Sequence, residues 1–210
     1  MTLTKNRADR VILDNISWQQ FENFLQDLGE NRAARVAYYD GRLEIITPLP
    51  EHEYYKKVVS IAVEDIAEEL ALKSETFGST IWRKESKKAG VEADDCFYFQ
   101  NEEVVRGRID LDLRQDPPPD LVLEIDITSK SLDRLPIYAR LGVPEIWCFD
   151  AGEIKIYLLQ NGEYIESEFS LVFPTLPIRQ LPQLIEKYRF DGKLELRKAI
   201  REWVRENYKR

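Results

Sequence analysis

Histidine and cysteine are scarce in this chain of 210 residues, which contains only His52, Cys96 and Cys148 of these two types. Two cysteines cannot build a disulfide framework, so we expect both to be small core or strand residues in a protein of the reducing cytoplasm. A structural zinc site needs more cysteine and histidine ligands than these three. A serine-triad hydrolase is also disfavoured, because the chain has no Gly-x-Ser-x-Gly motif and only one histidine.

Long apolar runs and a surplus of basic residues are also missing. A bilayer-spanning helix needs about 18 or more consecutive apolar residues, and the sequence has no such run. The start of the chain, MTLTKNRADRVIL, lacks the apolar block of a signal peptide, so we expect no membrane partner. The formal net charge is −8. A dedicated nucleic-acid binder is usually basic, whereas an enzyme that holds a cation with carboxylates can be acidic if basic residues line the approach.

Core-forming residues are plentiful: 43% of the chain is hydrophobic and 11% aromatic, which is enough for one domain. Ser17 and Gly29 predict the two ends of a first helix, and Asp40-Gly41 predicts a type I′ hairpin turn. A long helix over about 51–73, a β-rich middle and further helices follow. We therefore predict an α/β fold with a mixed central β-sheet flanked by helices, an N-terminal helix–hairpin extension and C-terminal helices. The predicted boundaries are 1–16 for a flexible N-terminal segment, 17–187 for the α/β domain and 188–210 for a C-terminal helical extension.

An apolar stripe follows the last predicted helix, LELRKAIREWVREN. Leu196, Ile200 and Trp203 recur at helical spacing, and Leu194 stands just ahead of them. An aromatic stripe of this kind needs a covering surface, which is either the protein's own core or a second copy of the chain. We predict a homodimer, with packing on the chain's own core as the alternative.

The segment DLVLEID, residues 120–126, is apolar but carries acids at alternate positions. In a strand, Asp120, Glu124 and Asp126 share one face with Val122. Carboxylates are costly in a buried strand unless something compensates, and a divalent cation near the C-terminal end of the strand would do so. Asp120 and Glu124 lie about 13 Å apart along a strand, too far to ligate one ion. We therefore predict that Asp120 marks the strand entry and that Glu124 needs a partner carboxylate from elsewhere.

The segment GVEADDCFYF offers that partner. Asp94 and Asp95 stand where a turn enters an apolar, aromatic strand. Acids at such places are commonly turn residues whose side chains bond nearby backbone groups. The alternative is that one of them joins Glu124 at a metal site, and spacing alone leaves both interpretations open.

Five segments, taken in their order, carry a family resemblance. They are DGRLEIITP, EHE at the start of the long helix, GVEADDCFYF, PPPDLVLEIDITS and YARLGVPEIWCFD. Together they resemble a bacterial restriction-endonuclease-like family of the PD-(D/E)XK nuclease superfamily, over roughly residues 17–185. The resemblance implies a restriction-endonuclease-like core, DNA as the partner and a metal-dependent reaction.

The resemblance also implies a ligand set. Ala93-Asp94 stands where the superfamily has Pro-Asp, which implies that Asp94 is a metal ligand. Glu124 matches the acid of the following strand, and the backbone carbonyl of Ile125 would be the third ligand. Hard oxygen ligands of this kind suit Mg²⁺ or Mn²⁺ rather than zinc or copper.

This sequence differs from the superfamily motif at the position of the motif lysine. The position two residues after Glu124 holds Asp126 instead. Relatives that carry the lysine on the next helix have it where this chain has Arg134, which stays protonated and cannot easily act as a base. We expect the helix to point Arg134 toward solvent, and Lys130, the nearest lysine after the strand, to stabilise charge. The candidate catalytic set is therefore Asp94, Glu124, Asp126 and Lys130.

The long helix and three basic pairs supply further candidates. His52 and Glu53 could hold or orient a ligand, although acids at a helix start also simply meet the positive end of the helix dipole. The basic pairs could line a phosphate path or form solvated faces. They are Lys56-Lys57, Arg83-Lys84 and Lys87-Lys88.

Two functions stay open from the sequence. The first is a Mg²⁺- or Mn²⁺-dependent endodeoxyribonuclease in which the cation polarises the phosphate and activates water. The second is a catalytically degenerate nuclease fold that acts as a binding or scaffold module, favoured by the missing lysine and the net charge of −8. We expect removal of Asp94 or Glu124 to leave the fold intact or more stable in metal-free buffer, because the two carboxylates would repel each other.

Overall fold

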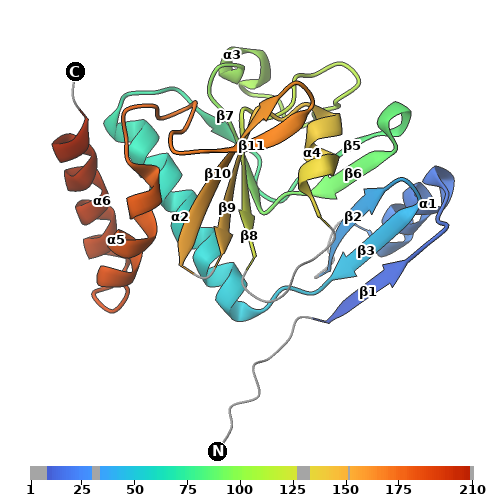
Figure 1. The fold of residues 1–210 in the computed structure, drawn as a ribbon, viewed down its shortest axis with the longest axis horizontal. Coiled ribbons are helices and arrows are strands. Elements are labelled where there is room, and N and C mark those ends of the chain that lie inside the picture. Colours follow the sequence, from blue (N-terminus) through green and yellow to red (C-terminus); the bar gives the residue numbers. More distant parts are fainter. Residues whose placement is uncertain (1–8, 30–33, 127–132, 151, 209–210) are drawn as a thin grey trace, which may run out of the picture.

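Two β-sheets form the frame of the protein. The computed structural model of the chain describes residues 9–29, 34–126, 133–150 and 152–208. Within these residues one sheet has five strands in the order β1-β3-β2-β6-β5, and the other has six in the order β11-β10-β9-β8-β7-β4. In Figure 1 the smaller sheet lies to one side of the larger one, which is flanked by helices.

The smaller sheet is antiparallel in all of its described pairings. Its hairpin between β2 and β3 turns at Asp40 and Gly41, whose φ angles of 48° and 89° are both positive, as a type I′ turn requires. The predicted hairpin is therefore confirmed. The strands are β1 (Arg10–Leu13), β2 (Arg35–Tyr39), β3 (Arg42–Ile46), β5 (Ile81–Lys84) and β6 (Ala89–Glu92).

Helix α1 (Trp18–Leu28) packs on this sheet through a small apolar cluster that includes Phe21. Its start is a capping box: the Gln20 N–H donates to the Ser17 hydroxyl at 3.2 Å, and the Ser17 N–H donates to the Gln20 side chain at 2.7 Å. Gly29, with φ of 68°, ends the helix. The helix boundaries predicted from Ser17 and Gly29 are confirmed.

The larger sheet is mixed, as predicted. β8 runs parallel to β9, and the other described pairs are antiparallel. Helix α4 (Leu135–Leu141) lies between β8 and β9 in the chain, because parallel neighbours need a crossover connection. The strands are β4 (Glu75–Thr76), β7 (Asp95–Tyr98), β8 (Leu121–Ile125), β9 (Glu145–Asp150), β10 (Glu153–Gln160) and β11 (Glu163–Ser167).

The alternating side chains of β8 separate two cores. Leu121 and Leu123 pack with helix α2 (Pro50–Glu69) on one face of the larger sheet. Val122 packs on the other face with Tyr138 of α4 and with residues of the smaller sheet. The predicted strand alternation is therefore confirmed, and the face that carries Val122 is the one expected to carry Glu124.

The C-terminal helices α5 (Leu181–Lys187) and α6 (Lys193–Asn207) lie beside α2, on the side away from the smaller sheet (Figure 1). The fully buried Asp65 of α2 accepts hydrogen bonds from Arg197 at 2.8 Å and Arg201 at 2.7 Å. The apolar stripe of α6 is buried in the same core as α2, so the chain itself covers it. The stripe consists of Leu196, Ile200 and Trp203.

Three short elements complete the described chain: α3 (Glu102–Val105) and the 3-10 turns η1 (Glu85–Lys87) and η2 (Ile178–Gln180). Across the described residues, no helix combines the length and the hydropathy that crossing a bilayer requires.

Candidate functional site

Asp94 and Glu124 lie at the same end of the β7–β8 pair. These strands are antiparallel, with Asp95 opposite Leu123. Continued by one residue, this register sets Asp94 opposite Glu124. The Asp94 carboxylate also accepts a hydrogen bond of 2.6 Å from the backbone N–H of Ile125. The fold therefore brings together the two acids and the backbone residue that the sequence proposed as ligands, although they are about 30 positions apart.

Both acids are buried. Asp94 is 0% exposed and Glu124 is 7% exposed. A carboxylate removed from water is costly unless hydrogen bonds or opposite charges replace its hydration. The residues that supply this compensation define the site.

Arg35 is the main partner of Asp94. It begins β2 in the smaller sheet, is only 5% exposed, and forms a close ion pair with the Asp94 carboxylate through Nη1. Its Nη2 donates to Glu53 Oε1 of α2 at 3.1 Å. Arg35 therefore joins the smaller sheet, the start of α2 and the β7–β8 end at one point.

His52, on the first turn of α2, lies between two acids. Its Nε2 is 3.2 Å from Asp94 Oδ1, and its Nδ1 is 3.3 Å from Glu53 Oε1. Burial, and then the positive charge of Arg35, lower the pKa of His52 to about 4, so the ring is neutral at pH 7. A neutral imidazole carries one N–H and can donate to only one of the two carboxylates.

Glu124 is held from helix α4. Arg134 Nη1 donates to Glu124 Oε2 at 2.5 Å, and the Tyr138 hydroxyl makes a short hydrogen bond to Oε1. Burial alone would lower the pKa of Arg134, but the surrounding acidic groups, Glu124 first among them, together outweigh it and the pKa is raised. The expectation that Arg134 points to solvent is therefore wrong. The reason is physical: a buried carboxylate on the neighbouring strand attracts the guanidinium inward.

The charged side chains around Arg35 carry an excess of negative charge. Counting Arg35 itself, four carboxylates face two guanidinium groups and the nearby ammonium of Lys56, which leaves one formal negative charge. The four acids are Glu53, Glu92, Asp94 and Glu124, and the second guanidinium belongs to Arg134.

The donor chemistry suits a particular kind of ion. Carboxylate oxygens are the ligands of hard cations, and Mg²⁺ is usually held by one or two carboxylates while it keeps several waters. Over the part of the chain that the structure describes, no three Asp, Glu, His or Cys side chains are grouped as a metal cage. Asp94 and Glu124 therefore fit an ion that retains water better than one that needs a closed set of protein ligands, and binding would exchange some of their present contacts.

The two other predicted catalytic residues are Asp126 and Lys130, and only Asp126 lies within the described residues. Asp126 directly follows β8 and is half-buried, and its backbone N–H donates to the Phe149 carbonyl at 2.8 Å. Its carboxylate helps to raise the pKa of Cys148 to about 12, after burial and the charge of Glu124. Asp126 thus lies close to the site end of β8. Lys130 falls outside the described residues.

The two remaining acids of the motifs have structural partners. Asp120 accepts hydrogen bonds from the backbone N–H groups of Phe99 at 2.7 Å and Asn101 at 3.0 Å, and from the Asn101 side chain at 2.7 Å. Its prediction as a strand-entry residue is confirmed. Asp95 is the first residue of β7 rather than a turn residue, and its carboxylate accepts hydrogen bonds from the Cys96 N–H at 2.9 Å and from the Thr76 hydroxyl of β4 at 3.0 Å.

Two site residues were missed by the sequence interpretation. Arg35 opens the strand RVAYY, in which the first four residues are buried, and a charged residue in a buried strand was a usable signal. Tyr138 lies in the helix LPIYARL at the position four residues after Arg134, which places both side chains on one helix face. Their common target, Glu124, could not be inferred without the fold.

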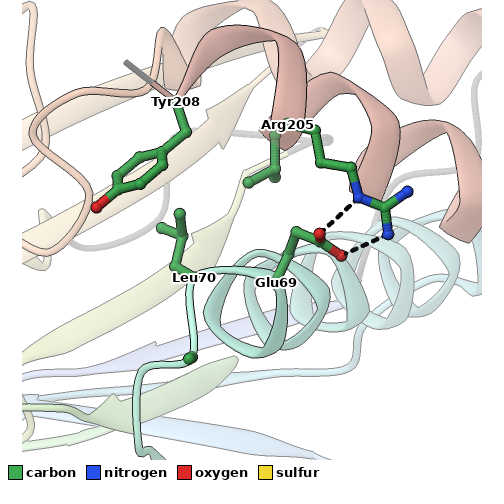
Figure 2. Close-up of a pocket in the computed structure, with 6 residues that line it drawn as sticks. Glu69, Leu70, Arg205 and Tyr208 are labelled. Atoms are coloured by element: carbon green, nitrogen blue, oxygen red, sulfur yellow. Dashed lines mark hydrogen bonds and ion pairs between the residues drawn. The ribbon is translucent and has the colours of Figure 1, made fainter. Parts of the chain in front are cut away.

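A separate pocket lies at the other end of α2 (Figure 2). It has a volume of about 560 Å³ and includes Glu69, Tyr208 and Arg205, with Arg205 Nε bonded to Glu69 at 2.6 Å. Its lining contains neither Asp94 nor Glu124, so it does not belong to the acidic site.

Comparison with known proteins gives a family and a structural relative. Residues 18–189 match the model of the Uma2 family, whose description is "Putative restriction endonuclease". A solved structure described as a "putative nuclease belonging to DUF820" from Anabaena variabilis ATCC 29413 is similar, with a TM-score of 0.47 and 17% identity. That similarity covers 90% of this chain and 99% of the other. Comparison with curated proteins gives no match.

Proposed function

The chain belongs to the Uma2 family, and we propose that it is a Mg²⁺- or Mn²⁺-dependent endodeoxyribonuclease that hydrolyses DNA phosphodiester bonds. The observation that supports this most is the pair Asp94 and Glu124, buried at one end of two adjacent strands within a cluster that carries excess negative charge. Membership of a nuclease-type family supports the reaction class, and the two buried acids support the presence of metal ligands.

Asp94, Glu124 and the Ile125 carbonyl would hold the cation. When bound, the cation polarises the phosphate and makes water more acidic. The chain's own contribution is to position these ligands: Ile125 N–H and Arg35 orient Asp94, while Arg134 and Tyr138 orient Glu124. Arg134 cannot serve as a base because its guanidinium stays protonated.

Lys130 is the proposed donor to the charge that develops on the phosphate, and Asp126 the proposed acid beside it. For both residues the support is the motif: Asp126 stands at the usual lysine position, and Lys130 is the nearest lysine that follows. The structure gives Arg134 a different task, because it is bonded to Glu124 rather than free to reach a substrate.

A second candidate function is a catalytically degenerate nuclease fold that serves as a binding or scaffold module. The observation that favours it is that guanidinium groups already neutralise both buried acids, Asp94 through Arg35 and Glu124 through Arg134. A site of this kind is stable without a cation. The two functions differ in one property: only the nuclease gains stability from millimolar Mn²⁺.

The homodimer remains a prediction, but the apolar stripe of α6 no longer supports it. The α6 stripe that suggested it is covered by the chain's own core. The monomer–dimer question is therefore best decided by light scattering at high micromolar concentration, where a monomer mass would remove the dimer.

Cleavage of closed circular duplex DNA tests the proposed activity. We expect wild-type protein to nick or linearise the circle in MgCl₂ or MnCl₂ and to leave it intact in EDTA. Asp94→Asn should abolish cleavage, whereas the matched control Asp95→Asn, whose carboxylate bonds Thr76 and Cys96, should retain it. Cleavage by Asp94→Asn at the wild-type rate would indicate a contaminating nuclease and contradict the proposal.

A further inference from the structure

Lys56 lies near the backbone carbonyl of Asp94. It lies one helical turn after His52 on α2, so the two side chains share a helix face. Its ammonium is 2.6 Å from the Ser79 hydroxyl, and that hydroxyl donates to the Asp94 carbonyl at 3.4 Å. His52 meets the Asp94 carboxylate at 3.2 Å. The first two turns of α2 therefore approach the side chain and the backbone of the same acid.

Lys56 differs from the two other cations of the site in its partner. Arg35 and Arg134 each make a close contact with a buried carboxylate. The ammonium of Lys56 makes its short contact with a neutral hydroxyl, and its ion pair with Glu53 is long at 3.9 Å. Much of the charge of Lys56 is therefore not neutralised at short range.

The surroundings of Lys56 favour an added anion. Its side chain is 19% exposed, so it keeps a path to solvent. Burial, and then the charge of Arg35, lower the pKa of Lys56. An ammonium that has lost part of its hydration beside another cation gains from a negative group that replaces the lost water.

Ser79 adds a second donor at the same place. It is exposed, and it lies in the loop between β4 and β5 directly after Gly78, whose φ of 57° is in the left-handed region. A hydroxyl donates one hydrogen bond and rotates to suit its acceptor, so donation to a phosphate would replace the long 3.4 Å bond to the Asp94 carbonyl. Lysine and serine side chains are both common donors to the phosphates of DNA.

We propose that Lys56 and Ser79 together bind a backbone phosphate of the DNA strand on the α2 side of Asp94. This inference rests on the proposed function, because it places the strand at that site. It also explains how a chain with a net charge of −8 can hold DNA: a local cation, rather than the overall charge, positions the phosphate beside the acids.

The test is duplex binding by fluorescence anisotropy over a series of KCl concentrations, in CaCl₂ so that an oxygen-ligated ion is present in place of Mg²⁺ or Mn²⁺. Lys56→Gln should weaken binding about tenfold, and the slope of log affinity against log salt should fall by about one. Ser79→Ala should weaken binding by less, because it removes one neutral donor. Lys56→Arg keeps the charge and should retain the slope.

The matched control is Lys57→Gln, the neighbouring exposed lysine on α2, which should leave the slope nearly unchanged. Equal losses of affinity and slope for Lys56→Gln and Lys57→Gln would overturn the inference, because they would show general attraction only. The wild-type protein in MgCl₂ tests the proposed function separately. Binding that depends on Lys56 without cleavage would support the phosphate site and contradict the nuclease, and a wild type that binds no DNA would overturn both.

Discussion

The guanidinium of Arg35 lies between the carboxylates of Asp94 and Glu53, ion-paired to the first and hydrogen-bonded to the second at 3.1 Å. A side chain with one positive charge thus partly neutralises an acidic site that we propose for a divalent cation. Cation and guanidinium would compete for the same carboxylates. This proposed competition would determine several measurable properties of the protein.

Asp94→Asn should destabilise the metal-free protein. Repulsion between the two carboxylates alone predicts that removal of one leaves the free energy of unfolding unchanged or higher. The structure shows instead that Arg35 would lose its buried partner. Breaking a buried ion pair on one side costs about 3 kcal/mol when the remaining charge is left unpaired, and we expect a smaller loss here because Arg35 keeps its 3.1 Å hydrogen bond to Glu53. Urea unfolding in EDTA measures the change in the free energy of unfolding.

A double-mutant cycle with Arg35→Gln identifies the cause of that loss. If the ion pair is responsible, the double variant should be less destabilised than the sum of the two single variants. Strict additivity of the two losses would show that Asp94 and Arg35 act independently.

Arg35→Gln alone should increase the affinity for Mn²⁺. Its removal frees Asp94 and Glu53 from a competing cation, and we expect a gain of about tenfold, the size expected for losing one like-charged neighbour at short range. Isothermal calorimetry in low-salt buffer measures it. A weaker affinity in this variant would mean that Arg35 orients the ligands more than it competes for them.

Arg134→Ala should lower stability and disturb Glu124. The side chain is only 13% exposed and is bonded to the buried Glu124, so its loss leaves that acid with Tyr138 as its remaining described side-chain donor, at a cost of about 3 kcal/mol. Arg140→Ala is the matched control, since this arginine lies on the same helix but pairs with the exposed Asp40, where ion pairs contribute about 1 kcal/mol or less. Equal melting temperatures for the two variants would contradict the role given to Arg134.

Local elements could be predicted from the sequence because the signals lie within a few residues. The Ser17–Gln20 capping box and the Asp40-Gly41 turn are examples in which side chains bond or shape their own neighbourhood. The alternation in β8 likewise separated Leu121 from Val122 correctly.

Contacts between distant segments could not be predicted in the same way. Arg35 reaches Asp94 from another sheet, and Arg134 turns inward because Glu124 is buried, which depends on how α4 packs on β8. The α6 stripe shows the same limit: an apolar helix face requires a cover, but only the fold reveals that α2 provides it.

Lys130→Ala should lower the cleavage rate at saturating Mn²⁺ by about 10²–10³-fold, the effect of losing one charge-stabilising donor. This prediction depends on sequence position alone. The salt slope of DNA binding should change less than in Lys56→Gln, because Lys130 is proposed to act on the developing charge and Lys56 on a bound phosphate. If only Lys56→Gln lowered the rate, Lys56 on α2 rather than Lys130 would be the charge-stabilising residue.

The central claim is that Asp94 and Glu124 bind one divalent cation together, and calorimetric titration of Mn²⁺ tests it most directly. The wild type should bind one ion, and Asp94→Asn and Glu124→Gln should each lose binding. Asp120→Ala should bind as the wild type does, although it loses the acceptor of three hydrogen bonds and should unfold more easily. If the wild type binds no Mn²⁺ at millimolar concentration, or if Asp120→Ala loses the ion while Asp94→Asn keeps it, the account of this site is contradicted.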